Sequence, residues 1–542
     1  MKLKYGFLVV LLGLCFILVA CSNNTTTPVT TAPVTKTTTT TSAAPVTTVP
    51  TSPAASTVTP QYGGTVMMWI NSDPVSLYPP SMTGQSDGQT AGLGLEPLFY
   101  LDKQSNLVPL LATDWKSDAT AKTITLTLRK GVKFQDGSDF NAAVCKWNLD
   151  QYRTSSRAEL KKVSSVDVVD DYTVRLNLAS YDNTIITNLS IASDAGRMVS
   201  KQSFDANGGK DWASANPIGT GPFQLVTWTK SVGLTWKRFD GYWGGKPYLD
   251  GVQMKEYADQ TTALMDFQAG NIHVLGLPDP RNAQSLQASG KYNVVTPPEG
   301  QVPAMAGYAK DPASPFSKVE VRQAMSYALD TKTMADSFGL GYWQVQNQWA
   351  LPGTSGYNPN VVGYPYNPQK AKDLLAQAGF ASGITTTLSF WALSPTYQDE
   401  SVAMQTYWKA VGINVTLNPI QRPAFADAAS NGKGWVGILR EQGSSSPDPL
   451  IKYAGTAAGI EFNGIALPQE FVDTYNQAIA APDAKTKQQL TWQLMSLATD
   501  KYCMASYLYV QHYATAKAKT LHDDLYQELP YAYFSPKAWL SK

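Results

Sequence analysis

The chain has 542 residues, with 43 lysines and arginines against 42 aspartates and glutamates and a formal net charge of +1. A charge so close to zero argues against nucleic acid as a partner, because proteins that bind it usually carry a basic surplus. The length is sufficient for two or more domains with a large core.

The N-terminus has the features of an export signal. Lys2 and Lys4 precede Phe7–Ala20, an uncharged apolar run of 14 residues. A membrane-spanning helix needs about 20 residues, so the run predicts a signal peptide over 1–20. The motif "LVAC" is similar to the bacterial lipobox, which implies that Cys21 is lipidated and anchors the protein without spanning the membrane. An ordinary secretory signal followed by a chance cysteine is the alternative.

The segment 21–60 differs in composition from the rest of the chain. Threonine, serine and proline dominate it, and Lys36 is its only charge. Such a segment cannot bury enough apolar surface to offset the entropy lost on ordering. We expect a disordered tether between the lipid and a folded part that starts at Gln61. A disordered tail without a reach function has the same composition.

Strand patterns dominate the first half of the folded part. In "TITLTLRKG", Ile124, Leu126 and Leu128 alternate with threonines before a glycine, which predicts a half-buried strand. The stretch "VDVVDDYTVRLNL" predicts a hairpin that turns at 170–171. A second hairpin, "GPFQLVTWTKSVGLTWKRF", is expected to turn near 230–231. Phe134 in "LRKGVKFQDG" is expected to be buried.

The second half alternates helices and strands. Asn367 and Pro368 suit the start of a helix, and Gly379 suits its C-cap. The stretches "ITTTLSFW", "YQDESVAMQTYWKAV" and "INVTLNPI" then predict strand, helix and strand, which is a βαβ unit with a parallel sheet. Helices are expected over 468–480 and 484–499, and a strand over "ASYLYVQ". The change in pattern predicts two lobes with a cleft between them.

The sequence contains few motifs typical of catalytic or metal sites. "GQSDG" around Ser86 matches the G-x-S-x-G motif of hydrolases, but the two prolines in "SLYPPSMT" before it suit a central strand poorly. No CxxC, HExxH or acidic calcium loop occurs. We therefore expect a binding protein with no catalytic residue, metal or cofactor. A hydrolase that uses Ser86 and a surface adhesin or scaffold remain alternatives. The pairing of Cys145 with Cys503 is left open.

Several segments in order resemble one family. They include "GGTVMMWINSDPVSLYP", "NPIGTGPFQLVTWTKSVGLTWKRFDGYWGGKPYLDGV" and "YPYNPQKAKDLLAQAGF". The chain resembles the extracytoplasmic solute-binding proteins, family 5, of ABC importers, which include oligopeptide-, dipeptide- and nickel-binding proteins. The resemblance covers nearly all of 62–540. The matching segments are 63–79, 107–144, 216–252, 314–330, 364–380 and 412–420.

The resemblance implies an α/β fold with two lobes and a hinge. It is the periplasmic-binding-protein-like fold of type II, in the large cluster C variant with an extra subdomain. The hinge crossings are expected near 303 and 506. The first lobe is expected to comprise 61–100, 215–302 and 506–542, with an inserted subdomain at 101–214, and the second lobe to comprise 303–505.

The resemblance also implies a function. Such a protein captures an oligopeptide or similar organic solute between its lobes and delivers it to the permease subunits of an ABC transporter. It is expected to be monomeric and lipid-anchored outside the bacterial cytoplasm. A nickel chelate is a variant of this interpretation that His512 leaves open.

One loop departs from the pattern of the peptide-binding members. There it often has the sequence "ADYPDP", and its first aspartate pairs with the amino terminus of the peptide. The matching stretch here is "SSSPDP", 444–449, so Ser445 stands at the aspartate position. A serine supplies no negative charge, and burying an ammonium without one is costly. The resemblance therefore argues against amine-anchored peptides unless the nearby Glu441 replaces the charge.

The remaining binding residues follow from their positions in the family pattern. Arg422 and Arg440 fall near cleft-lining positions and favour a solute with an anionic group. Tyr507 and Tyr509 are expected on one face of the returning strand, and Tyr308 near the hinge. The residues expected around the solute are Thr83, Gly84, Gln85, Tyr308, Arg422, Arg440, Glu441, Gln442, Gly443, Ser444, Ser445, Tyr507 and Tyr509.

Overall fold

The computed structural model describes residues 59–83, 85–392, 395–429, 434–441, 443, 446–525 and 534–542. The predicted signal, Cys21 and nearly all of the tether lie outside these residues. So do Gly84, Gln442, Ser444 and Ser445, and the side chains of Gln85 and Ser86 are not described. Within the described residues, no helix has the length and apolar character that a bilayer-spanning segment needs.

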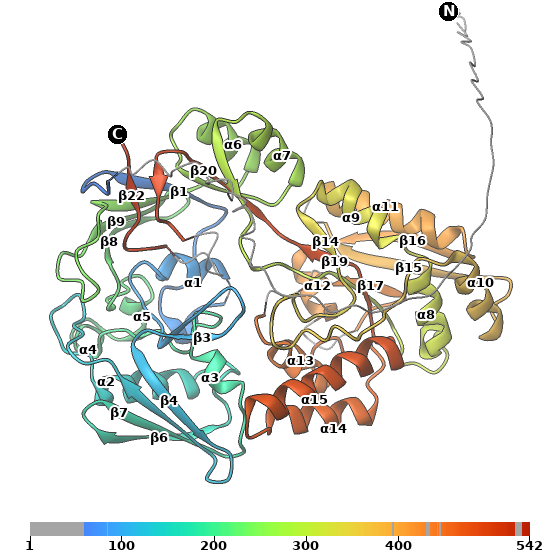
Figure 1. Cartoon of the computed structure of the whole chain (residues 1–542), viewed down its shortest axis with the longest axis horizontal. Helices are drawn as coiled ribbons and strands as arrows, with labels where there is room; N and C mark the ends of the chain where they lie inside the picture. Colours follow the sequence, from blue (N-terminus) through green and yellow to red (C-terminus); the bar gives the residue numbers. More distant parts are fainter. Residues whose placement is uncertain are drawn as a thin grey trace, which may run out of the picture. The chain divides into compact units, whose positions relative to one another are not determined.

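The largest sheet has seven strands in the order β12-β20-β11-β1-β10-β9-β8 (Figure 1). The predicted hairpin near 230 is confirmed, since β8 and β9 pair antiparallel around a turn in which Ser231 has a φ of 58°. β1 pairs in parallel with β10. The strands are β1 (Thr65–Ile70), β8 (Phe223–Thr229), β9 (Gly233–Arg238), β10 (Gly251–Glu256), β11 (Val274–Leu277), β12 (Tyr292–Val295) and β20 (Ala514–Ala518).

A separate four-stranded antiparallel sheet has the order β4-β5-β7-β6. Its β6–β7 hairpin confirms the turn predicted at 170–171. The alternation predicted in β5 is also confirmed, because Ile124, Leu126 and Leu128 are buried in one core with Phe134. Helix α2 packs on β6. The elements are β4 (Ala112–Asp118), β5 (Thr123–Leu128), α2 (Ala142–Arg153), β6 (Val163–Asp170) and β7 (Thr173–Leu178).

The third sheet has five strands in the order β16-β15-β17-β13-β18. β15 and β16 pair in parallel and α11 connects them, which confirms the predicted βαβ unit. The predicted helix caps are confirmed as well, since the Asn367 side chain accepts from Lys370 N and Gly379 has a φ of +87°. The elements are β13 (Ala304–Gly307), α10 (Pro368–Gln377), β15 (Ile384–Trp391), α11 (Pro395–Lys409), β16 (Ile413–Ile420), β17 (Ile438–Glu441) and β18 (Ser506–Tyr507).

The strand predicted over 505–511 is interrupted. β18 pairs with β13, whereas β19 (Tyr509–Gln511) pairs with β14 (Trp343–Val345). The chain rejoins the seven-stranded sheet only at β20, which starts at Ala514. We therefore propose that the return crossing lies between Gln511 and Ala514. The other lobe boundaries are kept as proposed from the sequence.

The remaining elements complete the chain, and the two helices predicted after residue 468 are confirmed as α14 and α15. They are η1 (Pro79–Ser81), α1 (Gln85–Ala91), β2 (Phe99–Leu101), β3 (Leu107–Pro109), α3 (Ile185–Asn188), α4 (Lys201–Ala206), α5 (Lys210–Ala213), α6 (Gln260–Gln268), α7 (Pro280–Ala288), η2 (Pro315–Ser317), α8 (Val319–Tyr327), α9 (Thr331–Gly339), α12 (Arg422–Ala429), α13 (Pro449–Ala457), α14 (Gln469–Ile479), α15 (Ala484–Ser496), η3 (Leu497–Lys501), β21 (Leu521–His522) and β22 (Trp539–Leu540).

A buried carboxyl group joins the segment after α1 to the loop after β9. Glu96 accepts hydrogen bonds from Tyr242 Oη at 2.6 Å and from Thr220 Oγ1 and Trp243 Nε1 at 2.8 Å each. The Arg129 guanidinium lies 4.8 Å from the centre of the Trp243 ring. Burial raises the pKa of Glu96 to about 7, against the lowering effects of these hydrogen bonds and of Arg129. This group therefore titrates near neutral pH.

The two cysteines of the folded part do not form a disulfide. Cys145 and Cys503 are both free and buried. Burial raises the pKa of each thiol. The protein therefore contains no cross-link between its described cysteines.

Candidate functional site

The carboxyl ends of three parallel strands meet at one edge of the five-stranded sheet. β15 ends at Trp391, β16 at Ile420 and β17 at Glu441. Open α/β sheets bind ligands at this edge. The loop 442–445, predicted from the sequence to contact the solute, follows β17 here. This edge is therefore the candidate site on the five-stranded sheet.

Arg440 on β17 is paired within the protein. Its Nη2 lies 2.8 Å from Glu400 Oε2, and the exposed fractions of the two side chains are 1% and 0%. The guanidinium lies 3.8 Å from the centre of the Tyr397 ring. Burial alone would lower the pKa of Arg440, but Glu400, Tyr397 and Tyr509 raise it. The expectation that Arg440 offers a free cation to an anionic solute is therefore wrong: its charge is balanced by Glu400.

The same pair is connected to both chain crossings. Glu400 accepts from Tyr509 Oη and from Gln511 Nε2, the latter at 3.3 Å. The Tyr397 and Tyr513 hydroxyls lie 3.2 Å apart, and Tyr513 Oη donates to Gln301 Oε1 at 3.0 Å. Gln301 and Gln511 also pair through their backbones. Helix α11 therefore bonds directly to the segments that run between the two large sheets.

Glu441 is also committed to a partner. Its Oε1 lies 2.6 Å from Lys452 Nζ, and both side chains are largely buried. Lys452 lies 4.8 Å from the centre of the Trp349 ring. Glu441 Oε2 is buried and has no hydrogen-bond partner among the described residues. Glu441 therefore provides one open acceptor atom but no uncompensated negative charge, which corrects its expected role as a replacement for the missing aspartate.

Arg422 differs from Arg440 in its surroundings. It is exposed at the start of α12, and its guanidinium lies 5.6 Å from the centre of the Trp391 ring. Trp391 in turn lies 6.3 Å from Phe425, measured between ring centres. Within the described residues, Arg422 makes no ion pair. Of the two arginines predicted to contact the solute, Arg422 is therefore the one whose charge is available at this edge.

The sequence predicted that Tyr507 and Tyr509 share one face of the returning strand, but the structure places them in different cores. Tyr507 lies in one core, with its hydroxyl 3.0 Å from that of Tyr453. Tyr509 lies in a different core, where its ring stacks on Trp343 at 4.9 Å and its hydroxyl donates to Glu400. The strand break between β18 and β19 changes the neighbouring strand and separates the two side chains.

Tyr308 does not lie near the hinge. β13 runs from Ala304, opposite Glu441, to Gly307, opposite Ile438. Tyr308 follows Gly307 and therefore lies at the end of β13 away from the crossing. Its ring packs edge-on against Trp435 at 5.7 Å.

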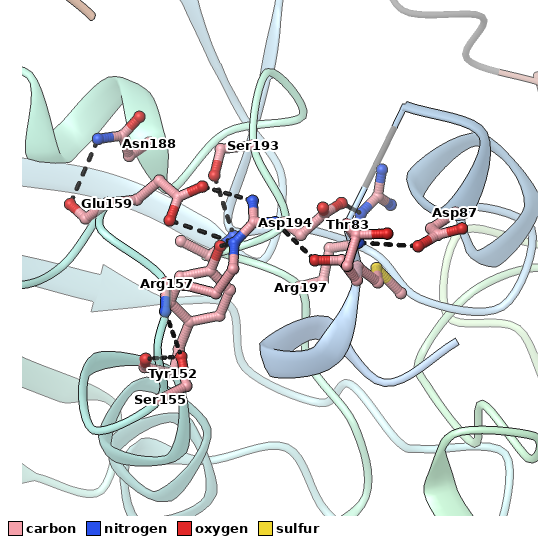
Figure 2. Close-up of polar contacts among 12 residues, drawn as sticks. Thr83, Asp87, Tyr152, Ser155, Arg157, Glu159, Asn188, Ser193, Asp194 and Arg197 are labelled. Atoms are coloured by element: carbon pink, nitrogen blue, oxygen red, sulfur yellow. Dashed lines mark hydrogen bonds and ion pairs between the residues drawn. The ribbon is translucent and has the colours of Figure 1, made fainter. Parts of the chain in front are cut away.

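The segment predicted to flank the solute from the first lobe is fixed by charged side chains. Asp87 accepts from the backbone of Thr83 and of Val75, at 2.8 Å each. Arg157 Nη1 donates to Met82 O. Figure 2 shows Asp194 with Arg157 on one side of it. Thr83 and Asp87 lie on the other side. The backbone around Thr83 is therefore anchored from two sides.

Asp194 packs directly on α1. A Cβ atom at Gly88 would stand 2.7 Å from Asp194 Oδ1, so the helix approaches the carboxylate closely only because residue 88 is glycine. Burial raises the pKa of Asp194, although Arg197 and Arg157 act to lower it. Arg197 Nε lies 3.2 Å from Asp194 Oδ1. This contact fixes α1, whose first residue is Gln85.

The structure gives no support to a hydrolase that uses Ser86. The 3-10 helix η1 and not a strand precedes α1, so the strand-turn-helix context of that motif is missing. The three histidines bond elsewhere: His273 Nδ1 accepts from Met67 N, His512 Nδ1 lies 3.0 Å from Glu299 O, and His522 stacks on Trp539. Among the described residues, no group of three or more His, Cys, Asp or Glu side chains could hold a metal ion.

These sheets, joined by chain crossings and with a candidate site at the strand ends, define a two-lobed fold of the periplasmic-binding-protein class. The crystal structure of the ABC transporter substrate binding protein CtaP from Listeria monocytogenes matches it with a TM-score of 0.79 and 20% identity. The match covers 89% of this chain and 100% of that one. It confirms the predicted fold class.

Residues 106–458 match the model of the bacterial extracellular solute-binding proteins, family 5. The chain belongs to this family, as the sequence segments indicated. The glutathione-binding protein GsiB of Salmonella choleraesuis (strain SC-B67) is 34% identical over 300 residues, 54% of this chain and 57% of that protein. The dipeptide-binding protein of Escherichia coli (strain K12) is 28% identical over 370 residues, 61% of this chain and 68% of that protein. The chain thus aligns with little more than half the length of GsiB.

Proposed function

We propose that the protein is the substrate-binding component of an ABC importer. It captures a peptide or a similarly sized organic solute between its lobes and delivers it to a membrane permease, without chemical change to the solute. Membership of the solute-binding family over 106–458 carries this proposal. A solute that contacts both lobes stabilises the closed state and so shifts the population towards it.

The charges at the candidate site favour particular solutes. Arg440 and Glu441 are each neutralised by a partner inside the protein, whereas Arg422 is exposed beside Trp391. Ser445 stands where an aspartate would pair with an ammonium. We propose that the site prefers peptide-like solutes with an acidic or uncharged group at this edge. The glutathione- and dipeptide-binding relatives make peptides the first class to test.

The test is a binding assay on the exported chain with Cys21→Ser, which removes the lipid. Native mass spectrometry before and after mild denaturation shows whether a small molecule is released. Calorimetry then compares glutathione, dipeptides and oligopeptides, each with a free and with an acetylated amino terminus. We expect binding in at least one series, with acetylation changing Kd less than about threefold. If the amino terminus of the peptide were instead buried against an anion of the protein, acetylation would weaken Kd by on the order of 100-fold.

Two results would contradict this proposal at different levels. If none of the peptides binds and no small molecule is released, a peptide-binding function is wrong. If only peptides with a free amine bind, capture is correct, but the role given to Ser445 is wrong.

We also propose that Cys21 is lipidated and that 21–60 tethers the folded part outside the cytoplasmic membrane. The support is the lipobox-like "LVAC" after an apolar run too short to span a bilayer. The protein should take up radiolabelled palmitate in growing cells and sediment with membranes. The Cys21→Ser variant should do neither. A variant that stays with the membrane fraction would show that another feature anchors the protein.

A further inference from the structure

Helix α14 ends without a glycine cap, although the backbone N–H groups of Ala480 and Ala481 donate to Asn476 O and Ala478 O. Its last turn contains no basic residue, and its C-cap, Ala480, has right-handed helical dihedrals rather than the left-handed ones of a glycine cap. Pro482 follows closely and has no N–H to donate. The last carbonyls of a helix need donors from outside it. For Ile479 O a donor, and for Ala478 O an additional donor, come from a distant part of the chain.

Asn183 supplies them. Its backbone N–H donates to Ile479 O at 2.8 Å. Its side-chain Nδ2 donates to Ala478 O at 2.8 Å and to Ala481 O at 3.2 Å, and both contacts are buried. Three donors on one residue therefore cap a helix almost 300 positions further along the chain. Figure 1 shows α3, which starts two residues after Asn183, beside the end of α14.

The loop that carries Asn183 is held in shape before it reaches α14. Asp182 Oδ1 accepts from Thr184 N at 2.9 Å and from Thr184 Oγ1 at 2.6 Å. Asp182 Oδ2 lies 2.7 Å from Lys162 Nζ. These bonds are all local to the inserted subdomain. The loop is therefore preorganised, and the contact with α14 does not depend on ordering it.

The two partners belong to different lobes in the organisation proposed above. Asn183 lies in the inserted subdomain of the first lobe, whereas α14 belongs to the second. Neither side of the contact includes a residue expected to touch the solute. A contact of this kind forms when the lobes approach and is lost when they separate.

We infer that Asn183 is an affinity-determining residue that acts without touching the solute: it caps α14 across the lobes and so favours the closed state. The inference rests on the proposed solute-binding function. Asn183 Oδ1 is buried without a hydrogen-bond partner among the described residues. The amide is therefore used for its donors, which is the requirement for a helix C-terminus with its partial negative charge.

The test uses Asn183→Ala in the exported chain with Cys21→Ser. The variant loses both side-chain bonds, which on this inference form only in the closed state. We expect the solute to dissociate about three- to tenfold faster, with Kd weakened by the same factor, since a net hydrogen bond changes an equilibrium by about this much. Asn183→Asp, which places an oxygen against the carbonyls, should weaken binding further. Asn207→Ala is the matched control, because among the described residues its amide bonds only to Ser203 O in the same subdomain.

A second measurement does not need a solute. Spin labels at Lys116→Cys and Lys485→Cys report the distance between the two lobes, and Cys145 and Cys503 are buried. In the ligand-free protein, Asn183→Ala should shift this distance distribution to longer values, whereas Asn207→Ala should not. Thermal melting confirms that each variant folds.

The outcomes separate the two proposals. If the wild type binds no solute, the proposed function is wrong, and the spin-label distances are then the only test of the contact between Asn183 and α14. If Asn183→Ala leaves the distances as they are in Asn207→Ala, the inference is wrong. It is also wrong if the distances change but the dissociation of a bound solute does not.

Discussion

Replacing Glu400 by alanine should lower the free energy of unfolding by about 3–5 kcal/mol, among the largest effects of any single substitution in this protein. The carboxylate is fully buried against Arg440, and no other anion is paired with that guanidinium among the described residues. The substitution would leave a buried positive charge with only Tyr397 beneath it. Urea unfolding at neutral pH, followed by fluorescence, gives the change directly.

The double variant Glu400→Leu with Arg440→Met is the decisive comparison. It removes both charges at similar volume and should be much less destabilised than Glu400→Ala, because desolvation of an ion pair offsets most of its Coulomb energy. Arg175→Met is the control for losing an arginine, since its pair with Asp167 is exposed and exposed ion pairs contribute little to stability. Equal losses in the single and double variants would show that packing, and not the unpaired charge, determines the effect.

This pair also explains why the sequence misassigned Arg440. Arginine near a cleft favours an anion, and the sequence places no acid beside it except Glu441. Its partner, Glu400, is 40 residues away on α11. The sequence predicted this helix but not which of its side chains would face Arg440. The expectation of a solute carboxylate therefore applies to Arg422, whose neighbour Trp391 was predicted only as the end of a strand.

Local patterns were sufficient for elements whose ends are set by nearby residues. The strands 384–391 and 413–420 and the helix start at Asn367 match their predictions because alternation and caps are local effects. The interruption at Leu508 could not be predicted in this way. It arises because Leu508 N donates to Pro303 O while Gln346 N donates to Leu508 O, so the strand changes partners. Pairing choices between distant segments have no signature in a single sequence.

The candidate site was predictable in outline but not in its charges. The family pattern placed Arg422 and Glu441 near the cleft, and the structure places both at the carboxyl ends of β15 to β17. The pairing of Glu441 with Lys452 was not predicted. Lysine side chains are usually exposed, whereas the side chain of Lys452 is largely buried here. Whether a charge is free depends on tertiary neighbours.

Glu96 should make the stability of the protein fall as the pH rises through neutrality. Burial raises its pKa to about 7 in the folded protein, whereas an unfolded glutamate titrates near 4.3. The folded state therefore binds more protons between these values, so the stabilising contribution is complete below pH 4 and is lost as the pH passes 7. The loss amounts to about 3 kcal/mol by linkage.

Glu96→Gln isolates this contribution. Glutamine can accept from Trp243 and Thr220 and donate to Tyr242 Oη, as a protonated carboxyl would, but it does not titrate. The unfolding free energy of the wild type minus that of Glu96→Gln should therefore fall by about 3 kcal/mol between pH 4 and pH 8. Glu470→Gln is the control, because hydrogen bonds from Lys501 and Tyr502 lower the pKa of that exposed carboxyl, which gives the opposite sign. A difference that stays constant with pH would show that the three donors and Arg129 keep Glu96 ionised throughout, and that burial does not dominate at this site.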